Sequence, residues 1–214
     1  MFDDTNIAYT QEGLEYKIEN IRSFYTFYEK THTTEVNLKM LFEEKGLDYP
    51  ENEDFPYKIS LEKWSPKEGK PYFEQSKLIV HYREKNRRGE IRERELELER
   101  NYPSTYLELV KQNDNYYLIF GHDYQGISSV NLNKKTISYY LPKAVLRGGG
   151  FCVAGINSWN EYSNTLSVEG CHWGGPYINR IYNIEDLDNI HLSSLIYDGY
   201  DDFDPYEGEE NDNI

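Results

Sequence analysis

Residues 165–184 read TLSVEGCHWGGPYINRIYNI and contain two strand-like runs on either side of a glycine-rich break. Apolar and polar residues alternate in both runs, which is typical of half-buried β-strands. Gly174, Gly175 and Pro176 separate the runs, and residues of these types mark turns. The stretch therefore predicts a β-hairpin, with Cys171 and His172 next to its turn.

An earlier stretch, LIFGHDYQGISSVNL at residues 118–132, follows the same plan. Gly121, Tyr124 and Gly126 precede Gly170, Trp173 and Gly175 by 49 residues each. Repeats of about 40–50 residues built from β-hairpins are typical of propeller blades. Two such units, or three if residues 77–98 form another, are fewer than the roughly four to eight blades of a closed propeller. An open, bent antiparallel sheet or a stack of small sheets is expected, unless the echo is a coincidence in a chain rich in Gly and Tyr.

The strand signals are strongest over residues 115–184. Upstream, KLIVHYRE and EIRERELEL flank KNRRG, which predicts a further hairpin. The second of these runs also fits a helix, because Glu90 and Arg94 are four residues apart, but its alternation favours a strand. Residues 47–76 hold four of the eight prolines and predict a long connection with one short strand near residues 57–61.

Residues 11–46 predict a helical hairpin. Apolar positions recur every three or four residues in its first half, at Leu14, Ile18, Ile21, Tyr25 and Tyr28. Thr33 or Thr34 would cap the second helix, and Lys45 and Gly46 would end it. The predicted fold class is α+β, mainly antiparallel β, with this helical hairpin packed on bent, propeller-blade-like meander sheets. The predicted divisions are residues 1–76, an antiparallel β region at 77–197 and an acidic tail at 198–214.

Residues 117–184, with their DYQG, GGGFC, LSVEGCHW and PY motifs, resemble an uncharacterised group of bacterial proteins with blade-like sheets. Members of that group carry a similar Gly-Gly-Gly-Phe-Cys followed by Val-x-Gly-Cys-x-Trp-x-x-Pro-Tyr. The resemblance covers about a third of the chain. It implies an antiparallel, blade-like fold and no particular activity.

Negative charge is concentrated at the C-terminal end. The net charge is −15, and residues 181–214 hold 11 of the 38 acidic residues and none of the 23 lysines and arginines. Such a segment is either a solvated tail or a surface that docks on a basic partner through carboxylates and rings. Four rings favour docking: Tyr197, Tyr200, Phe203 and Tyr206. The chain has neither an apolar run of about 18 residues nor a secretory signal at its start, so we expect a cytoplasmic protein that does not span a membrane.

Cys152 and Cys171 are predicted to face each other across a hairpin. If Ser158 lies opposite Thr165, paired residue numbers sum to 323, and the two cysteines satisfy this rule. Paired thiols in the cytosol are expected to be buried and reduced, with a disulfide or a metal site as alternatives. His122, Cys152, Cys171 and His172 form only a weak candidate metal set, because their spacing lacks the usual short ligand pairs. Neighbouring strand residues point to opposite faces, so we expect Cys171 inside, His172 outside, and no nucleophile–base pair.

Other motifs carry weaker signals. RGGGF at residues 147–151 predicts a flexible bulge and not a phosphate loop, because a strand follows it. The basic run at residues 82–100 holds seven Lys or Arg from Arg83 onward but also six Glu, which predicts an ion-paired hairpin and no nucleic-acid binding. Residues 122–125, with Trp173 and Tyr177, predict either a ligand-binding rim or ordinary turn capping by Asp123.

The favoured function is a non-enzymatic acidic protein, of the inhibitor or immunity type, that binds a basic protein surface without a cofactor. The alternative is a small-ligand or metal-binding enzyme that uses the loops at 122–125 and 171–177. A structural subunit with a permanent partner is a third possibility. The predicted binding residues are Tyr124, Gln125, Trp173, Tyr177, Tyr197, Tyr200, Asp201, Asp202, Phe203 and Tyr206.

Overall fold

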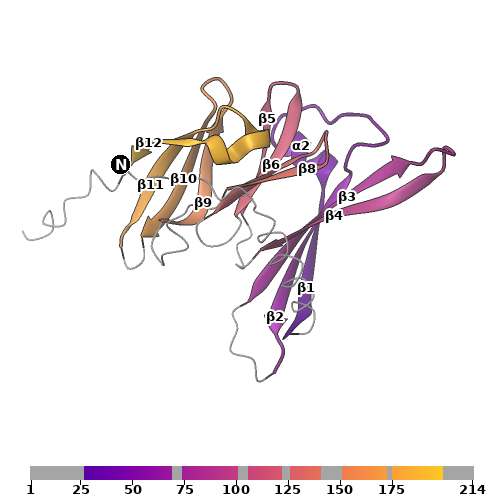
Figure 1. Ribbon diagram of the computed structural model, residues 1–214, viewed down its shortest axis with the longest axis horizontal. Coiled ribbons are helices and arrows are strands. Elements are labelled where there is room, and N and C mark those ends of the chain that lie inside the picture. Colours follow the sequence, from indigo (N-terminus) through magenta and orange to yellow (C-terminus); the bar gives the residue numbers. More distant parts are fainter. Residues whose placement is uncertain are drawn as a thin grey trace, which may run out of the picture.

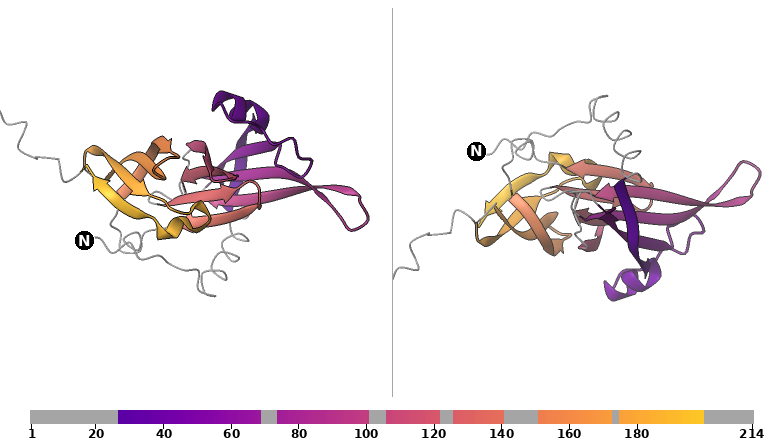
Figure 2. Two further views of the ribbon diagram at one scale, coloured as in Figure 1. Left: turned by 90° about the horizontal axis from the view of Figure 1, so that it is seen from above. Right: turned by 90° about the horizontal axis from the view of Figure 1, so that it is seen from below.

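Three antiparallel sheets of four strands each lie in a row in the computed structural model (Figure 1), which describes residues 27–68, 74–100, 106–121, 126–140, 151–172 and 175–199. Within each sheet, strands that follow one another in sequence are hydrogen-bonded neighbours. Two further views show the same order, with the central sheet between the other two (Figure 2). The prediction of a mainly antiparallel β protein is therefore confirmed.

The N-terminal sheet contains β1 (Tyr28–Asn37), β2 (Lys58–Pro66), β3 (Gln75–Lys85) and β4 (Ile91–Arg100). Helix α2 (Leu38–Glu44) follows β1 directly and begins where the Asn37 side chain accepts a hydrogen bond from the Lys39 amide. Its buried face, Leu38 and Phe42, packs into the core. The predicted hairpin over residues 77–98 is confirmed as β3 and β4, and the second run is a strand.

The central sheet contains β5 (Leu107–Gln112), β6 (Asn115–Gly121), β7 (Ile127–Asn131) and β8 (Thr136–Tyr140). The C-terminal sheet contains β9 (Phe151–Asn160), β10 (Thr165–His172), β11 (Tyr177–Asn183) and β12 (Ser194–Asp198), with a 3₁₀ helix, η2 (Leu187–Leu192), between its last two strands. Three hairpin turns place a non-glycine residue at positive φ, namely Asn113, Lys135 and Asn164. Asn tolerates this conformation better than most residues, which fits two of the three turns.

The central sheet is buried on both faces. Leu118 and Phe120 of β6 belong to a core shared with the N-terminal sheet and α2, whereas Tyr117 and Ile119 belong to a core shared with the C-terminal sheet. Successive side chains of a strand point to opposite faces, so β6 supplies both cores in turn. This explains its continuous apolar sequence and makes the three sheets one packed body.

The predicted helical hairpin is not supported. Residues 11–26 lie outside the described residues, and residues 28–37, which include the predicted link and the start of the second helix, form strand β1. The rest of the predicted second helix is the short helix α2, which ends at Lys45 and Gly46 as predicted. Thr31, Thr33, Thr34 and Val36 are β-branched, and this composition favours a strand. Because β1 is an exposed edge strand, it needs no regular apolar stripe, and its pairing with β2 decides the structure.

The described sheets stack in an open row, so no closed propeller is formed from them. The internal echo does correspond to equivalent elements, because β6–β7 and β10–β11 are the second and third strands of their sheets. In both sheets the glycine of the echo is overlaid by an aromatic ring. A Cβ on Gly121 would lie 2.5 Å from the Tyr106 hydroxyl oxygen, and one on Gly170 would lie 2.7 Å from a Phe151 ring carbon.

The predicted boundary at residue 76 falls within a sheet. It lies inside β3, which pairs with β2 from Lys58↔His81 to Trp64↔Gln75.

Candidate functional site: the C-terminal sheet and its hairpin turn

The C-terminal sheet has a core face and an outer face. Val168 of β10 pairs with Arg180 of β11, and Leu166 pairs with Tyr182; all four residues are buried toward the central sheet. The alternate residues therefore point away from the core. They include Cys152, Ser167, Glu169, Cys171, Tyr177, Asn179, Ile181 and Tyr197.

Cys152 and Cys171 are direct partners on this outer face, as predicted. The register that brings them together differs from the predicted one, because Thr165 pairs with Asn160 and Ser167 with Ser158. Two bulges in β9 then shift the pairing, and each leaves one extra residue on the bulged strand. No disulfide joins the two cysteines, and both are only half-buried, so the expectation of buried thiols is wrong. Among the described residues, no layer of strands or helices packs on this outer face, which accounts for the exposure.

His172 lies on the core side, which reverses the predicted inside and outside positions. Its Nε2 is 3.1 Å from Nη2 of Arg180, and its ring contacts Phe151 edge-on at 5.8 Å between centroids. Since an arginine can only donate, His172 accepts this hydrogen bond. Cys171 points to the other face, so the thiol and the imidazole do not form a nucleophile–base pair, and the two cysteines do not share a metal site with His172.

Arg180 is the centre of a buried ion pair. Its Nε and Nη2 bind the two carboxylate oxygens of Asp198 at 3.1 and 2.5 Å, and its guanidinium lies 4.3 Å from the centroid of the Phe151 ring. Burial alone would lower the pKa of Arg180, but hydrogen bonds to Asp198 and Tyr182 raise that pKa above its ordinary value. Arg180 is therefore a fixed cation that joins β11 to β12 and is only 7% exposed.

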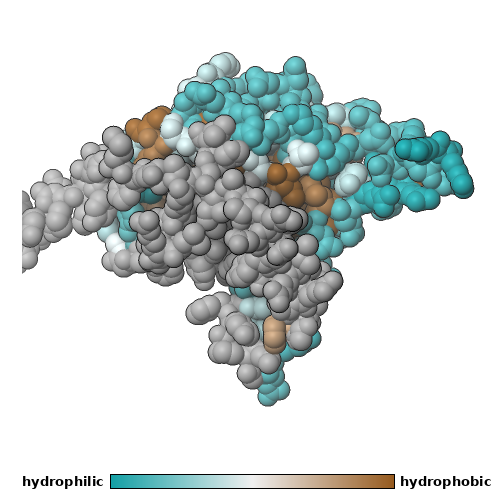
Figure 3. All heavy atoms as spheres, in the orientation of Figure 1, coloured by the Kyte–Doolittle hydropathy of each residue, from teal (hydrophilic) through white to brown (hydrophobic). Residues whose placement is uncertain are grey.

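The surface of this sheet is anionic. Arg180 is the one lysine or arginine from residue 148 to the end of the chain, against 13 acidic residues. Glu161, Glu169 and Glu185 are exposed, and none of them forms an ion pair with a described residue. The N-terminal sheet differs, because its long β3–β4 hairpin pairs charges such as Arg94 with Glu84 at 2.9 Å. Figure 3 shows the projecting end of this hairpin as strongly hydrophilic, and a hydrophobic patch over β12.

Three tyrosines are exposed on the same sheet: Tyr162 at 96%, Tyr177 at 66% and Tyr197 at 41%. Tyr177 and Tyr197 are on the outer face, and Ile196 of β12 is also 57% exposed. Exposed rings of this kind supply contact area with little loss of side-chain freedom. Tyrosines and unpaired carboxylates thus share one surface.

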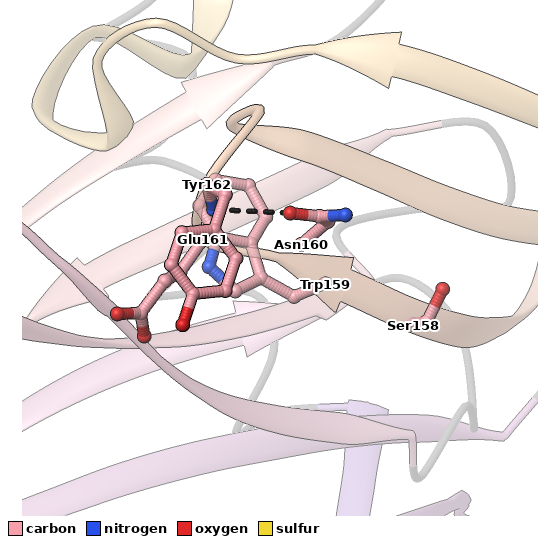
Figure 4. Close-up of a pocket in the computed structure, with 5 residues that line it drawn as sticks. All are labelled: Ser158, Trp159, Asn160, Glu161 and Tyr162. Carbon is pink, nitrogen blue, oxygen red and sulfur yellow. Dashed lines mark hydrogen bonds between the residues drawn. The ribbon is translucent and has the colours of Figure 1, made fainter.

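The turn between β9 and β10 forms a shallow, open depression lined by Ser158, Trp159, Asn160, Glu161 and Tyr162 (Figure 4). The side-chain oxygen of Asn160 accepts hydrogen bonds from the amides of Tyr162 and Ser163, at 3.0 and 3.2 Å. This bonding closes the turn and holds its backbone in a fixed conformation.

The turn is also anchored to the central sheet. Trp159 Nε1 donates to the Lys111 carbonyl at 3.2 Å, and Gln112 Nε2 donates to Asn164 Oδ1 at 3.0 Å. Gln112 is 4% exposed and also binds the backbone where η2 begins. Its Nε2 donates to the Ile184 carbonyl, and its Oε1 accepts from the Leu187 amide. The depression is therefore carried by a rigid support.

A second polar group fixes η2. Asp188 accepts hydrogen bonds from Asn131 at 2.8 Å and from Lys134. Burial pushes the pKa of Asp188 upward, but these hydrogen bonds outweigh it and leave that pKa below its ordinary value. Burial and the nearby carboxylates of Asp188 and Asp186 raise the pKa of Tyr117, so this tyrosine stays neutral in the folded protein.

Of the predicted binding residues, Tyr177 and Tyr197 lie on the sheet described above. The others lie outside the described residues and remain predictions: Tyr124, Gln125, Trp173, Tyr200, Asp201, Asp202, Phe203 and Tyr206, together with the candidate ligand His122. Within the described ranges, no three His, Cys, Asp or Glu residues are grouped as a metal site requires.

Sequence reasoning missed the depression, because residues 159–164 predicted only the turn of the hairpin that pairs Cys152 with Cys171. The available signal was Glu161 within two residues of Trp159 and Tyr162, two large rings where a turn needs only small polar residues.

Comparison with known protein families, curated proteins and solved structures finds no match to this chain. In the part of the chain that the structure describes, no helix has the length and apolar character required to cross a membrane.

Proposed function

We propose that this protein is a non-enzymatic binding protein whose C-terminal sheet engages a basic surface of a partner protein, in the manner of an inhibitor or immunity protein. The observation that carries the proposal is the charge of that sheet. Its one arginine is buried and paired with Asp198, while Glu161, Glu169 and Glu185 are exposed and have no cationic partner among the described residues.

Unpaired carboxylates favour a basic partner for two reasons. They attract it over a distance of about a Debye length, which speeds association at low salt. They also need not break an existing ion pair before they bind, unlike the glutamates of β3 and β4, which already face arginines. The acidic residues 200–214 follow β12 directly and would add to the same field.

The exposed tyrosines supply the contact area that charge alone lacks. Protein interfaces are enriched in tyrosine, which buries a ring and keeps a polar hydroxyl for hydrogen bonding. Tyr177 and Tyr197 are presented by β11 and β12, which the Arg180–Asp198 ion pair joins. This rigid presentation lowers the entropic cost of binding.

Binding to defined basic probes tests the proposal. Titration calorimetry with lysozyme, cytochrome c and a nona-lysine peptide is expected to show binding that weakens at least about tenfold between 50 and 300 mM salt. A triple variant, Glu161→Gln, Glu169→Gln and Glu185→Gln, is expected to lose most of this affinity. Deletion of residues 200–214, which keeps the Arg180–Asp198 pair, measures how much of the binding affinity comes from the tail.

The matched control changes the same charge elsewhere. Glu29, Glu43 and Glu44 are exposed on β1 and α2 and form no ion pair with a described residue. Their combined substitution by glutamine raises the net charge by the same three units. Equal losses in both triple variants would mean that only net charge matters. If none of the probes binds in a salt-sensitive manner, the proposal is overturned.

A further inference from the structure

The depression at the β9–β10 turn contains two aromatic rings and one free carboxylate. Trp159, Glu161 and Tyr162 line it together, and their side chains gather at the turn (Figure 4). Tyr162 is almost fully exposed, and Glu161 forms no ion pair within the described ranges. An aromatic face attracts a cation through its quadrupole, and a carboxylate beside it adds a hydrogen-bond acceptor of opposite charge.

The side chain of Lys111, whose backbone contacts Trp159, lies over another ring. Lys111 accepts the Trp159 hydrogen bond through its carbonyl, but its ammonium lies 5.9 Å from the centroid of the Tyr116 ring. The other cations placed over rings in the described parts of the chain lie on Tyr49, Tyr57, Trp64, Tyr82 and Phe151. No described cation therefore lies over the ring of Tyr162 or over Trp159, whose ring packs in part against the core.

The turn is built to keep its shape. Asn160 holds the backbone of Tyr162 and Ser163, Gln112 holds Asn164, and the Ser163 and Thr165 hydroxyl oxygens are 2.8 Å apart. A hydrogen bond from the Ile184 amide to the Asn164 carbonyl adds a contact to the chain leaving β11. Trp159 also packs against the core, whereas the most exposed position of the turn needs no tyrosine ring to reverse the chain.

We infer that Trp159, Glu161 and Tyr162 form the site that receives a lysine or arginine side chain of the basic partner. This inference rests on the proposed function and names the point of closest contact. Charge complementarity decides against a neutral ligand such as a sugar, because the nearby surface carries unpaired carboxylates. The alkyl stem of the cation lies against the rings, and its charged end reaches Glu161.

The test observes the site directly. The Trp159 indole N–H signal, assigned by its loss in Trp159→Phe, is followed by nitrogen–proton NMR during titration with Nα-acetyl-lysine methylamide and with a nona-arginine peptide. We expect a saturable shift with both cations and a much smaller shift with the Nε-acetylated, neutral lysine analogue. An equal shift with the neutral analogue or with a neutral oligosaccharide would overturn the inference.

Affinity measurements complete the test. Tyr162→Ala and Glu161→Gln are each expected to weaken nona-arginine binding by about three- to tenfold, the range of an exposed cation–π contact or ion pair. Met40→Ala and Glu44→Gln are the matched controls, because they remove an exposed apolar side chain and an exposed carboxylate from α2, outside the C-terminal sheet. All four variants change exposed side chains, so folding is not at stake.

The two proposals fail in different ways. If nona-arginine binds in a salt-sensitive manner but Tyr162→Ala and Glu161→Gln leave its affinity unchanged, the site is wrong and the acidic binding surface stands. If no basic probe binds the wild-type protein, the proposed function itself is wrong. A shift of the Trp159 signal confined to the small cation, without peptide binding, would establish a cation site and overturn its role in partner recognition.

Discussion

Cys152 and Cys171 are paired across β9 and β10. The register near the turn would not pair them, and two bulges in β9 shift it by the two residues required. Both side chains point away from the core and are half-buried. A pair in this position is accessible to reagents and close to the separation that a disulfide requires. Directly paired residues have Cβ atoms about 4.5–5.5 Å apart, whereas disulfides span about 3.5–4.5 Å.

We predict that both thiols react with Ellman's reagent in the native protein without denaturant. Diamide, which takes up the two electrons and two protons released, is expected to close an intramolecular disulfide, seen as a mass loss of two hydrogens. Cys171→Ser should retain one reactive thiol and form no intramolecular bond. Thiols that react only after unfolding in urea would contradict the outer-face position of both residues.

Turn chemistry and alternation predicted most of the strands between β3 and β11. Gly, Asn and Pro punctuate this region at short intervals, so local sequence decides where each strand ends. The β1 strand escaped prediction because it lies at a sheet edge, where pairing to β2 and not a buried stripe determines the structure. Its threonines were interpreted as helix caps although their β-branching favours a strand.

Side-chain positions were less predictable than strands. The cysteine pairing was predicted from a register that is wrong near the turn, because bulges leave no clear mark in the sequence. The faces of Cys171 and His172 were reversed, since which face is buried depends on the neighbouring sheet. The Arg180–Asp198 pair joins strands that η2 separates, and only tertiary structure brings those residues together.

Gly170 is predicted to be essential for packing at the core face. A Cβ there would lie 2.1 Å from the Cys152 carbonyl oxygen and 2.7 Å from the Phe151 ring. A backbone oxygen cannot rotate away, so Gly170→Ala is expected to lower the free energy of unfolding by about 3 kcal/mol or more. Urea denaturation followed by circular dichroism measures this loss.

Gly155 is the matched control on the neighbouring strand. A Cβ on Gly155 meets no atom within 4 Å, so Gly155→Ala is expected to change stability by only about 0.5 kcal/mol. Similar losses for both variants would show that strand glycines matter for backbone reasons and not through the Phe151 contact.

The Arg180–Asp198 pair is predicted to dominate the attachment of β12. Asp198→Asn removes the charge that compensates Arg180, which is 7% exposed, and leaves a buried cation with a weaker acceptor. Loss of one member of a buried pair costs about 3–5 kcal/mol. Glu84→Gln, which removes an exposed partner of Arg94, is expected to cost no more than about 1 kcal/mol. The hydrogen-exchange rates of the β12 amides, measured in both variants, should rise only in Asp198→Asn. Equal rates in both variants would contradict the conclusion that this ion pair holds β12 on the sheet.

Asp188 is predicted to make stability depend on pH at the acid end. Its pKa is lower in the folded protein than its ordinary value of 3.8, chiefly because hydrogen bonds from Lys134 and Asn131 outweigh its burial. A carboxylate with a depressed pKa stabilises the folded state above its unfolded pKa, and this contribution is lost as the pH falls through its folded pKa. Asp188→Asn is therefore expected to be less stable than wild type by about 1 kcal/mol at pH 7.

The difference between the two proteins should shrink as the pH falls below about 4, because the wild-type carboxylate is then protonated as well. Urea midpoints at pH 7, 5, 4 and 3 measure this convergence. Glu29→Gln is the control, since Glu29 is exposed and without an ion pair among the described residues, and its difference from wild type should stay near zero at every pH. A constant gap between wild type and Asp188→Asn down to pH 3 would show that the variant disturbs packing of η2 and not its charge. The Lys134–Asp188 contact would then position η2 between the central and C-terminal sheets without stabilising the fold through its charge.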